Sequence, residues 1–123
     1  MTTMPLNLIV LYVDDPQVSA KFYAHFLGVA PNALSPGFVA INAPGMPMLG
    51  LWSRAGVKPS PEGGPGMMEI GVMLGGDGVS VAYDRAVADG LDIIQPLYTG
   101  DFGPTFVVAD PDGHRIRVCQ PDD

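Results

Sequence analysis

The chain has 123 residues and a formal net charge of -7, with 47% hydrophobic and 15% charged residues. This length fits one domain with one hydrophobic core, and the apolar composition excludes a disordered chain. Only six Lys and Arg residues are present, which are too few for a basic surface that binds nucleic acid.

The sequence also argues against a membrane partner. No apolar run approaches the roughly 18 residues of a membrane span, and the N-terminus lacks the basic region and cleavage site of a signal peptide. We therefore expect a cytoplasmic protein. Cys119 is the single cysteine, and we interpret it as a small strand residue. The low charged fraction suggests that a partner chain covers some apolar surface, which makes a homodimer plausible.

The first half of the chain predicts a strand followed at once by a helix. Residues 6–13 (LNLIVLYV) are apolar and β-branched, which is typical of a strand. Asp15 can accept hydrogen bonds from free backbone amides at a helix start, and Pro16 suits the first helical position. Gly28 can end the helix in a left-handed conformation. The pattern therefore predicts a helix between Asp15 and Gly28.

Three strands are expected next, over residues 30–34, 38–42 and 46–53. Turn sequences Ser-Pro-Gly at 35–37 and Ala-Pro-Gly at 43–45 separate them. The order of the first half is thus β-α-β-β-β. Residues 58–66 (KPSPEGGPG) are too rich in proline and glycine for a helix or a sheet interior, and we interpret them as a linker.

The second half repeats this order. It predicts a strand at 67–74, a helix at about 77–89, and strands at 91–98, 105–108 and 115–120. The expected helix cap Asp77 and the terminating Gly90 follow Asp15 and Gly28 by the same interval of 62 residues (77 − 15 and 90 − 28). We interpret the chain as a single domain with module one at about 5–57, the linker, and module two at about 67–121.

A turn signal precedes the last strand. Residues 110–113 (Asp-Pro-Asp-Gly) combine a proline preset for a turn with a glycine that can adopt positive φ. Carboxylates are favoured in such turns for backbone reasons, so we interpret Asp110 and Asp112 as structural.

Residues 12–29 (YVDDPQVSAKFYAHFLGV) and 105–120 (TFVVADPDGHRIRVCQ) resemble the vicinal oxygen chelate superfamily, the glyoxalase, bleomycin-resistance and extradiol-dioxygenase fold. The resemblance covers essentially the whole chain. It implies an α+β fold of two paired βαβββ modules, whose curved mixed sheets form a cup, in proteins that are usually dimers.

Metal-dependent members of this superfamily place four ligands on strands that face the cup. The resemblance puts these positions at Leu8, Gly50, Glu69 and Arg117. Only Glu69 can bind a metal, whereas a divalent ion needs several converging donors. We therefore expect no metal, no cofactor, and no metal-dependent glyoxalase or dioxygenase activity.

Side chains alternate between the faces of a strand, so residues two positions from these sites also face the cup. The opposite face is uniformly aliphatic and forms the predicted core: Ile9, Leu11, Val13, Leu49, Leu51, Ile70, Val72, Leu74, Ile116 and Val118. The cup face is chemically mixed and includes Leu8, Val10, Gly71, Arg115 and Cys119. We predict that the ligand-binding residues are Tyr12, Phe38, Met48, Gly50, Trp52, Glu69, Met73, Tyr98 and Arg117.

Each of these residue types suits a flat organic ligand. Trp52 offers a planar stacking surface, methionines adapt to irregular shapes and glycines leave room. Arg117 could pair with a ligand carboxylate or with Glu69. Tyr98, Phe38 and Phe102 are expected at the rim. In the structural alternatives, Trp52 fills the cup or a dimer interface, and Glu69 and Arg117 form an ion pair.

Within the superfamily, residues 7–13, 50–53, 69–74 and 102–119 are most similar to the phenazine-resistance (griseoluteate-binding) members. This resemblance implies metal-independent sequestration of a planar aromatic, phenazine-like antibiotic in cups formed with a partner subunit. An alternative hypothesis is a lyase or isomerase that uses Glu69 as a general base. A third is an interaction module whose cup is filled by its own side chains.

Overall fold

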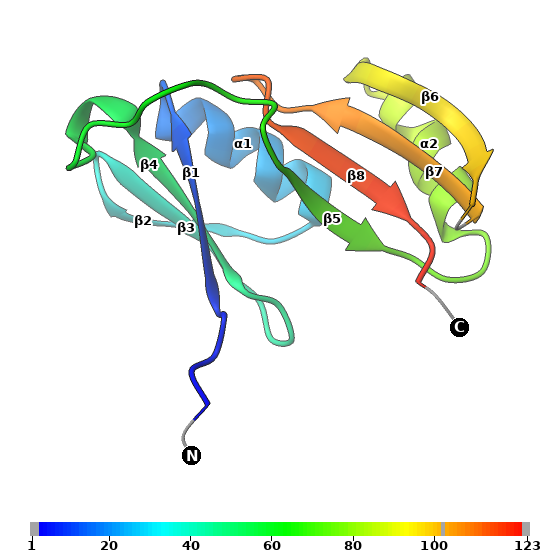
Figure 1. Cartoon of the computed structure of the whole chain (residues 1–123), viewed down its shortest axis with the longest axis horizontal. Coiled ribbons are helices and arrows are strands. Elements are labelled where there is room, and N and C mark those ends of the chain that lie inside the picture. Colours follow the sequence, from blue (N-terminus) through cyan, green and yellow to red (C-terminus); the bar gives the residue numbers. More distant parts are fainter. Residues whose placement is uncertain (1–2, 102, 122–123) are drawn as a thin grey trace. The chain divides into compact units, whose positions relative to one another are not determined.

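A computed structural model describes residues 3–101 and 103–121 of the chain. The chain divides into two compact units, Met1–Gly63 and Gly64–Asp123. Each unit contains a four-stranded mixed sheet and one α-helix, which confirms the α+β fold (Figure 1). Within the described residues, no helix is long and apolar enough to cross a membrane.

The first unit has the strand order β1-β4-β3-β2. Its elements are β1 (Leu8–Val13), α1 (Pro16–Leu27), β2 (Pro31–Ser35), β3 (Phe38–Ile41), β4 (Met48–Ser53) and the 3₁₀ turn η1 (Arg54–Gly56). Strands β1 and β4 are parallel, and the other neighbouring pairs are antiparallel. The helix follows β1 and precedes the other three strands, as the predicted order β-α-β-β-β requires.

The ends of α1 are set by the residues that the sequence indicates. Asp15 accepts a hydrogen bond at 3.0 Å from the backbone N–H of Gln17, and Pro16 is the first helical residue. Gly28 has φ +70° and its N–H donates to the carbonyl of Ala24 at 2.9 Å. A β-carbon in this left-handed conformation would be strained, so the glycine ends the helix cleanly.

The core of the first unit lies between its sheet and α1. The helix presents Ser19, Ala20 and Tyr23 to the sheet. The aliphatic side chains on the sheet face that packs against it are buried: Leu11, Val13, Val39, Ile41, Leu49 and Leu51. Full burial of one such side chain stabilises the folded state by about 1.5–3 kcal/mol. This face of the sheet therefore belongs to the core, and only the opposite face is left for other functions.

The second unit repeats the topology with the strand order β5-β8-β7-β6. Its elements are β5 (Glu69–Met73), α2 (Gly78–Ala88), β6 (Asp92–Gly100), β7 (Gly103–Ala109) and β8 (Arg115–Cys119). Strands β5 and β8 are parallel, like β1 and β4. Gly90 has φ +69° after α2, which reproduces the +70° of Gly28 after α1.

Two features of the second unit differ from the sequence prediction. Asp77 occupies the N-cap position of α2, but its side chain makes no capping hydrogen bond because its backbone (φ -92°, ψ 10°) is not extended. The β6–β7 hairpin is longer than predicted and runs to the pair Gly100 and Gly103. Gly103 has φ +99°, which lets the strands continue close to the turn.

The turn before β8 is organised by Asp110, which is 5% exposed. Its Oδ1 accepts hydrogen bonds from the backbone N–H of Asp112 at 2.9 Å and of His114 at 2.8 Å. Gly113 completes the turn with φ +97°. This carboxylate holds the backbone at the start of β8, the strand that carries Arg117.

Candidate ligand-binding site

The sheet face of the first unit that does not pack on α1 is arranged in rows across β1, β4 and β3. Residues in register are neighbours on the same face of the sheet. The rows are Tyr12–Trp52–Phe38, which we call the aromatic row, Val10–Gly50–Ala40, which we call the small row, and the pair Leu8–Met48. A band of small residues therefore lies beside a band of aromatic rings.

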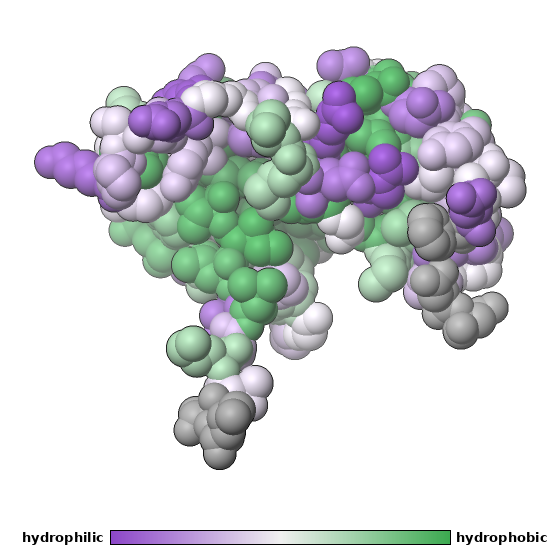
Figure 2. Space-filling model, viewed as in Figure 1, coloured by the Kyte–Doolittle hydropathy of each residue, from purple (hydrophilic) through white to green (hydrophobic). Residues whose placement is uncertain are grey.

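The rings of the aromatic row contact one another edge to face. The Trp52 centroid is 6.5 Å from that of Tyr12, with an interplanar angle of 73°. It is 6.2 Å from that of Phe38, at 66°. Figure 2 shows hydrophobic side chains gathered over β1 and the strands beside it, where Leu8 is 47% and Tyr12 41% exposed. This face combines aromatic and aliphatic surface that the chain itself leaves uncovered.

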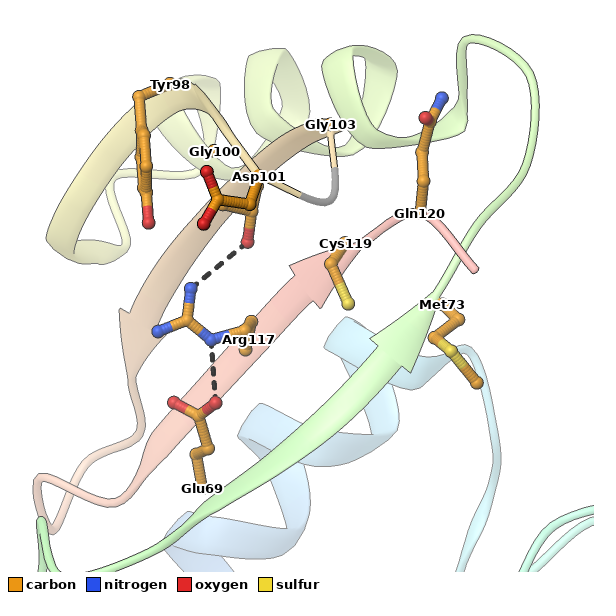
Figure 3. A pocket seen from close by; sticks show the side chains of 10 residues that line it. Glu69, Met73, Tyr98, Gly100, Asp101, Gly103, Arg117, Cys119 and Gln120 are labelled. Carbon is orange, nitrogen blue, oxygen red and sulfur yellow. Dashed lines mark hydrogen bonds and ion pairs between the residues drawn. The ribbon is translucent and has the colours of Figure 1, made fainter. Parts of the chain in front are cut away.

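The second unit contains a pocket of about 500 Å³ on the strands β5 to β8. Figure 3 shows its lining, in which Glu69 and Arg117 point toward each other between β5 and β8. The other lining residues are Met73, Tyr98, Gly100, Asp101, Gly103, Thr105, Cys119 and Gln120. The pocket therefore combines charged, hydroxyl and sulfur-containing groups, in contrast to the apolar face of the first unit.

Arg117 makes the main polar contacts of this pocket. Its Nε donates to Glu69 Oε1 at 2.7 Å, and its Nη1 donates to Thr105 Oγ1 at 3.2 Å. The hydrogen bond to Glu69 raises the pKa of Arg117 above its ordinary value, partial burial acts in the opposite direction, and Tyr98 adds to the rise. The guanidinium therefore remains cationic at every physiological pH.

Thr105 fixes the position of this guanidinium. The residue is buried, and its hydroxyl donates to the carbonyl oxygen of Val118 at 2.9 Å. Because that proton is used, the oxygen accepts from Arg117. Sequence reasoning missed Thr105. The only available signal was one hydroxyl residue in the apolar stretch of β7, and its place opposite Cys119 depends on a register that the sequence does not reveal.

The structure distributes the predicted ligand-binding residues between the two units. Five lie on the open face of the first unit: Tyr12, Phe38, Met48, Gly50 and Trp52. Four line the pocket of the second unit: Glu69, Met73, Tyr98 and Arg117. Phe102 lies outside the described residues. The aromatic row therefore comes from the first unit, and the ionic groups come from the second unit together with Tyr98.

The four positions that correspond to metal ligands in the superfamily do not fit a divalent ion. Leu8 and Gly50 provide no donor atom, and Arg117 is a cation bonded to Glu69. In the part of the chain that the structure describes, no group of three or more His, Cys, Asp or Glu side chains is placed to hold a metal. We derive no chemistry through a metal at these positions.

Comparisons with known proteins agree with this architecture. A model of the glyoxalase/bleomycin resistance protein/dioxygenase superfamily matches residues 6–118. The chain is 35% identical over 121 residues to the phenazine antibiotic resistance protein EhpR of Enterobacter agglomerans, which covers 95% of this chain and 92% of that protein.

Solved structures show the same fold. The solution NMR structure of protein ATC0852 from Agrobacterium tumefaciens matches with a TM-score of 0.85 and 35% identity, and the match covers 99% of this chain and 100% of that one. The crystal structure of a glyoxalase-related enzyme from Fulvimarina pelagi matches with a TM-score of 0.79 and 26% identity, over 97% and 89% of the two chains. These matches confirm the fold expected from the sequence.

Proposed function

The chain belongs to the glyoxalase/bleomycin resistance protein/dioxygenase superfamily, and from this premise we propose that it confers antibiotic resistance by sequestering a planar aromatic molecule of the phenazine type. The similarity to a phenazine resistance protein along nearly all of both chains supports the ligand class. In this proposal the protein binds its ligand without a metal and without chemical turnover.

Two separate observations carry the proposal: the first unit presents an aromatic row, and the second unit presents a guanidinium held by Glu69 and Thr105. A phenazine carboxylate has a flat ring system and one negative charge. Stacking on Trp52 contributes about 0.5–1.5 kcal/mol beyond the burial of area. A guanidinium has five N–H groups. Arg117 uses some of them on Glu69, Thr105 and Tyr98, and those that remain suit a carboxylate. The two groups thus match the two chemical features of the ligand.

We further propose that two copies of the chain complete the site. Leu8 and Tyr12 leave a large apolar surface exposed on the first unit, and such surfaces mark interaction sites. In the proposed homodimer, the aromatic row of one protomer and the pocket of its partner line one cup, so a dimer has two equivalent cups. Sedimentation equilibrium should then give twice the mass of the chain, and a monomer that binds the ligand fully would contradict this arrangement.

The experiment that tests the function is a fluorescence titration with phenazine-1-carboxylic acid. Trp52 is the only tryptophan of the chain and therefore reports unambiguously. We expect saturable quenching that is the same in chelator and with an added divalent ion. Binding that appears only with the ion would overturn the metal-independent proposal, and absence of binding in both conditions would overturn the ligand class.

A pair of variants locates the site. We expect Trp52→Ala to weaken binding of the same compound at least tenfold in calorimetry, since the stacking surface is removed, while the dimer stays folded. Val81→Ala is the matched control because Val81 is an exposed apolar residue on α2, outside the pocket and the aromatic row. Unchanged affinity in Trp52→Ala would remove the aromatic row from the site.

A further inference from the structure

The small row has a residue without a side chain at its centre. Val10, Gly50 and Ala40 are in register across β1, β4 and β3. The aromatic row lies on one side of them, and the pair Leu8–Met48 lies on the other. Gly50 therefore leaves a space above the sheet between these larger side chains, and we call this space the depression.

The ring of Phe38 occupies this depression. A β-carbon on Gly50 would lie 2.6 Å from Phe38 Cζ, 3.1 Å from Cε2 and 3.5 Å from Cε1. The tip of the ring is therefore nearest, and the ring enters the space above Gly50 end first. A glycine inside a strand often marks a close approach by another group, and here that group is an aromatic ring of the same chain.

Phe38 lies at the start of its strand. It is the first residue of β3, and the β2–β3 register shifts close by, between Ala33 and Ser35. Its side chain is partly exposed, and its described ring contact is with Trp52 at 6.2 Å. Rotation about two side-chain bonds moves such a ring without a change in the backbone, on a time scale far shorter than that of binding.

We propose that the space above Gly50 is a subsite for the edge of a planar aromatic ligand, and that Phe38 is its gate. The Phe38 ring fills the subsite in the free protein and rotates out when the ligand enters. The Phe38 ring lies directly above Gly50, so a flat six-membered ring of the same size suits this space. The identity of the natural ligand rests on the proposed function, whereas the subsite and its occupant do not.

The gate and the subsite predict opposite effects of two substitutions. Phe38→Ala removes the competing ring, so the association rate constant for phenazine-1-carboxylate should rise at least threefold in stopped-flow quenching of Trp52. Gly50→Ala places a methyl group in the subsite, so affinity should fall at least tenfold. In Gly50→Ala the added methyl group clashes only with the end of the flexible Phe38 side chain. If this variant still folds poorly, the double variant Phe38→Ala/Gly50→Ala, which lacks the clash, takes its place.

Indole provides a test that does not depend on phenazine binding. In Phe38→Ala, added indole should shift the NMR signals of the Gly50 amide and the Ala40 methyl group in a saturable way. The Ala20 methyl group is the internal control, because it lies on α1, which packs against the opposite face of this sheet. The double variant, in which position 50 carries a methyl group, should lose the response at the amide of that position and at the Ala40 methyl group. Equal responses in the single and double variants, or none in Phe38→Ala, would overturn the subsite.

The outcomes separate the two proposals. If the wild-type protein does not bind the phenazine but indole binds above Gly50 in Phe38→Ala, the proposed function fails and the subsite stands. If Gly50→Ala binds the phenazine as tightly as the wild type does, the function stands and the subsite is wrong. An unchanged association rate in Phe38→Ala would show that the ring is no gate.

Discussion

Arg117 reaches diagonally across the β8–β5 pair to Glu69, and the residue directly in register with Arg117 is Gly71. Gly71 contributes no side chain beside Arg117, whose Nε lies 2.7 Å from Oε1 of Glu69 on the same strand as Gly71. The two side chains are 33% and 40% exposed, so solvent screens the pair and its net stabilisation is about 0–1 kcal/mol. The pair therefore orients Arg117 more than it stabilises the fold.

Replacing Arg117 should discriminate between charged and neutral ligands. We expect Arg117→Gln to weaken binding of phenazine-1-carboxylate by about ten- to a hundredfold, because a hydrogen bond to a charged group contributes about 1.5–3 kcal/mol. Unsubstituted phenazine should bind almost unchanged. Arg115→Gln removes the same charge from an exposed neighbour on β8 and is the control. Equal losses in both variants, measured by calorimetry, would indicate a general charge effect.

Glu69→Gln should have the opposite effect on the affinity for the carboxylate. The substitution removes the negative charge that competes for Arg117, so binding of phenazine-1-carboxylate should tighten by a few fold at low salt. Denaturant unfolding should change by less than about 1 kcal/mol, since the pair is exposed. A wild-type protein that transforms the bound compound, and a Glu69→Gln variant that does not, would instead support the lyase or isomerase hypothesis.

Thr105 should act through the position of Arg117. Thr105→Val keeps the shape of the side chain but loses both hydroxyl contacts, so we expect a loss of about 1 kcal/mol in stability and weaker binding of the carboxylate. Thr105→Ser keeps the hydroxyl and should retain most of the affinity. The two variants should bind unsubstituted phenazine with the same affinity. A difference between them for this neutral ligand would show that Thr105 acts through packing and not through Arg117.

Asp110 should contribute to stability and not to binding. Asp110→Ala leaves the backbone N–H groups of Asp112 and His114 without their acceptor, which should cost about 1–3 kcal/mol in urea unfolding. Asp110→Asn keeps one acceptor oxygen and should therefore lose less stability. Ligand affinity per folded protein should remain that of the wild type in both variants. A stability loss of the same size in Asp110→Asn would assign the effect to the charge.

Local signals in the sequence predicted most of the backbone. Gly28 and Gly90 marked both helix ends, and the alternation along β1 and β4 separated Leu11 and Leu51 from the open face. Asp77 occupies the N-cap position that its spacing predicts, but its side chain makes no capping hydrogen bond, because that bond depends on a backbone angle that the sequence does not specify.

The site was less predictable because its contacts are non-local. The sequence suggested that Glu69 and Arg117 face the same side, yet their hydrogen bond depends on the β5–β8 register. The role of Thr105 depends on the β7–β8 register in the same way. The overlap of Phe38 and Gly50 depends on one side-chain rotamer, which no spacing of residues encodes.

The division into two units with the same strand order has an evolutionary consequence. The aromatic row that suits a flat scaffold comes from the first 63 residues, and Arg117, which suits an acid, comes from the remainder. Under the proposed function, mutations that adapt the protein to a new ring system fall in one half of its gene and leave the acid-binding half under unchanged selection. Recombination between related genes at the 58–66 segment would then exchange the two specificities as intact parts.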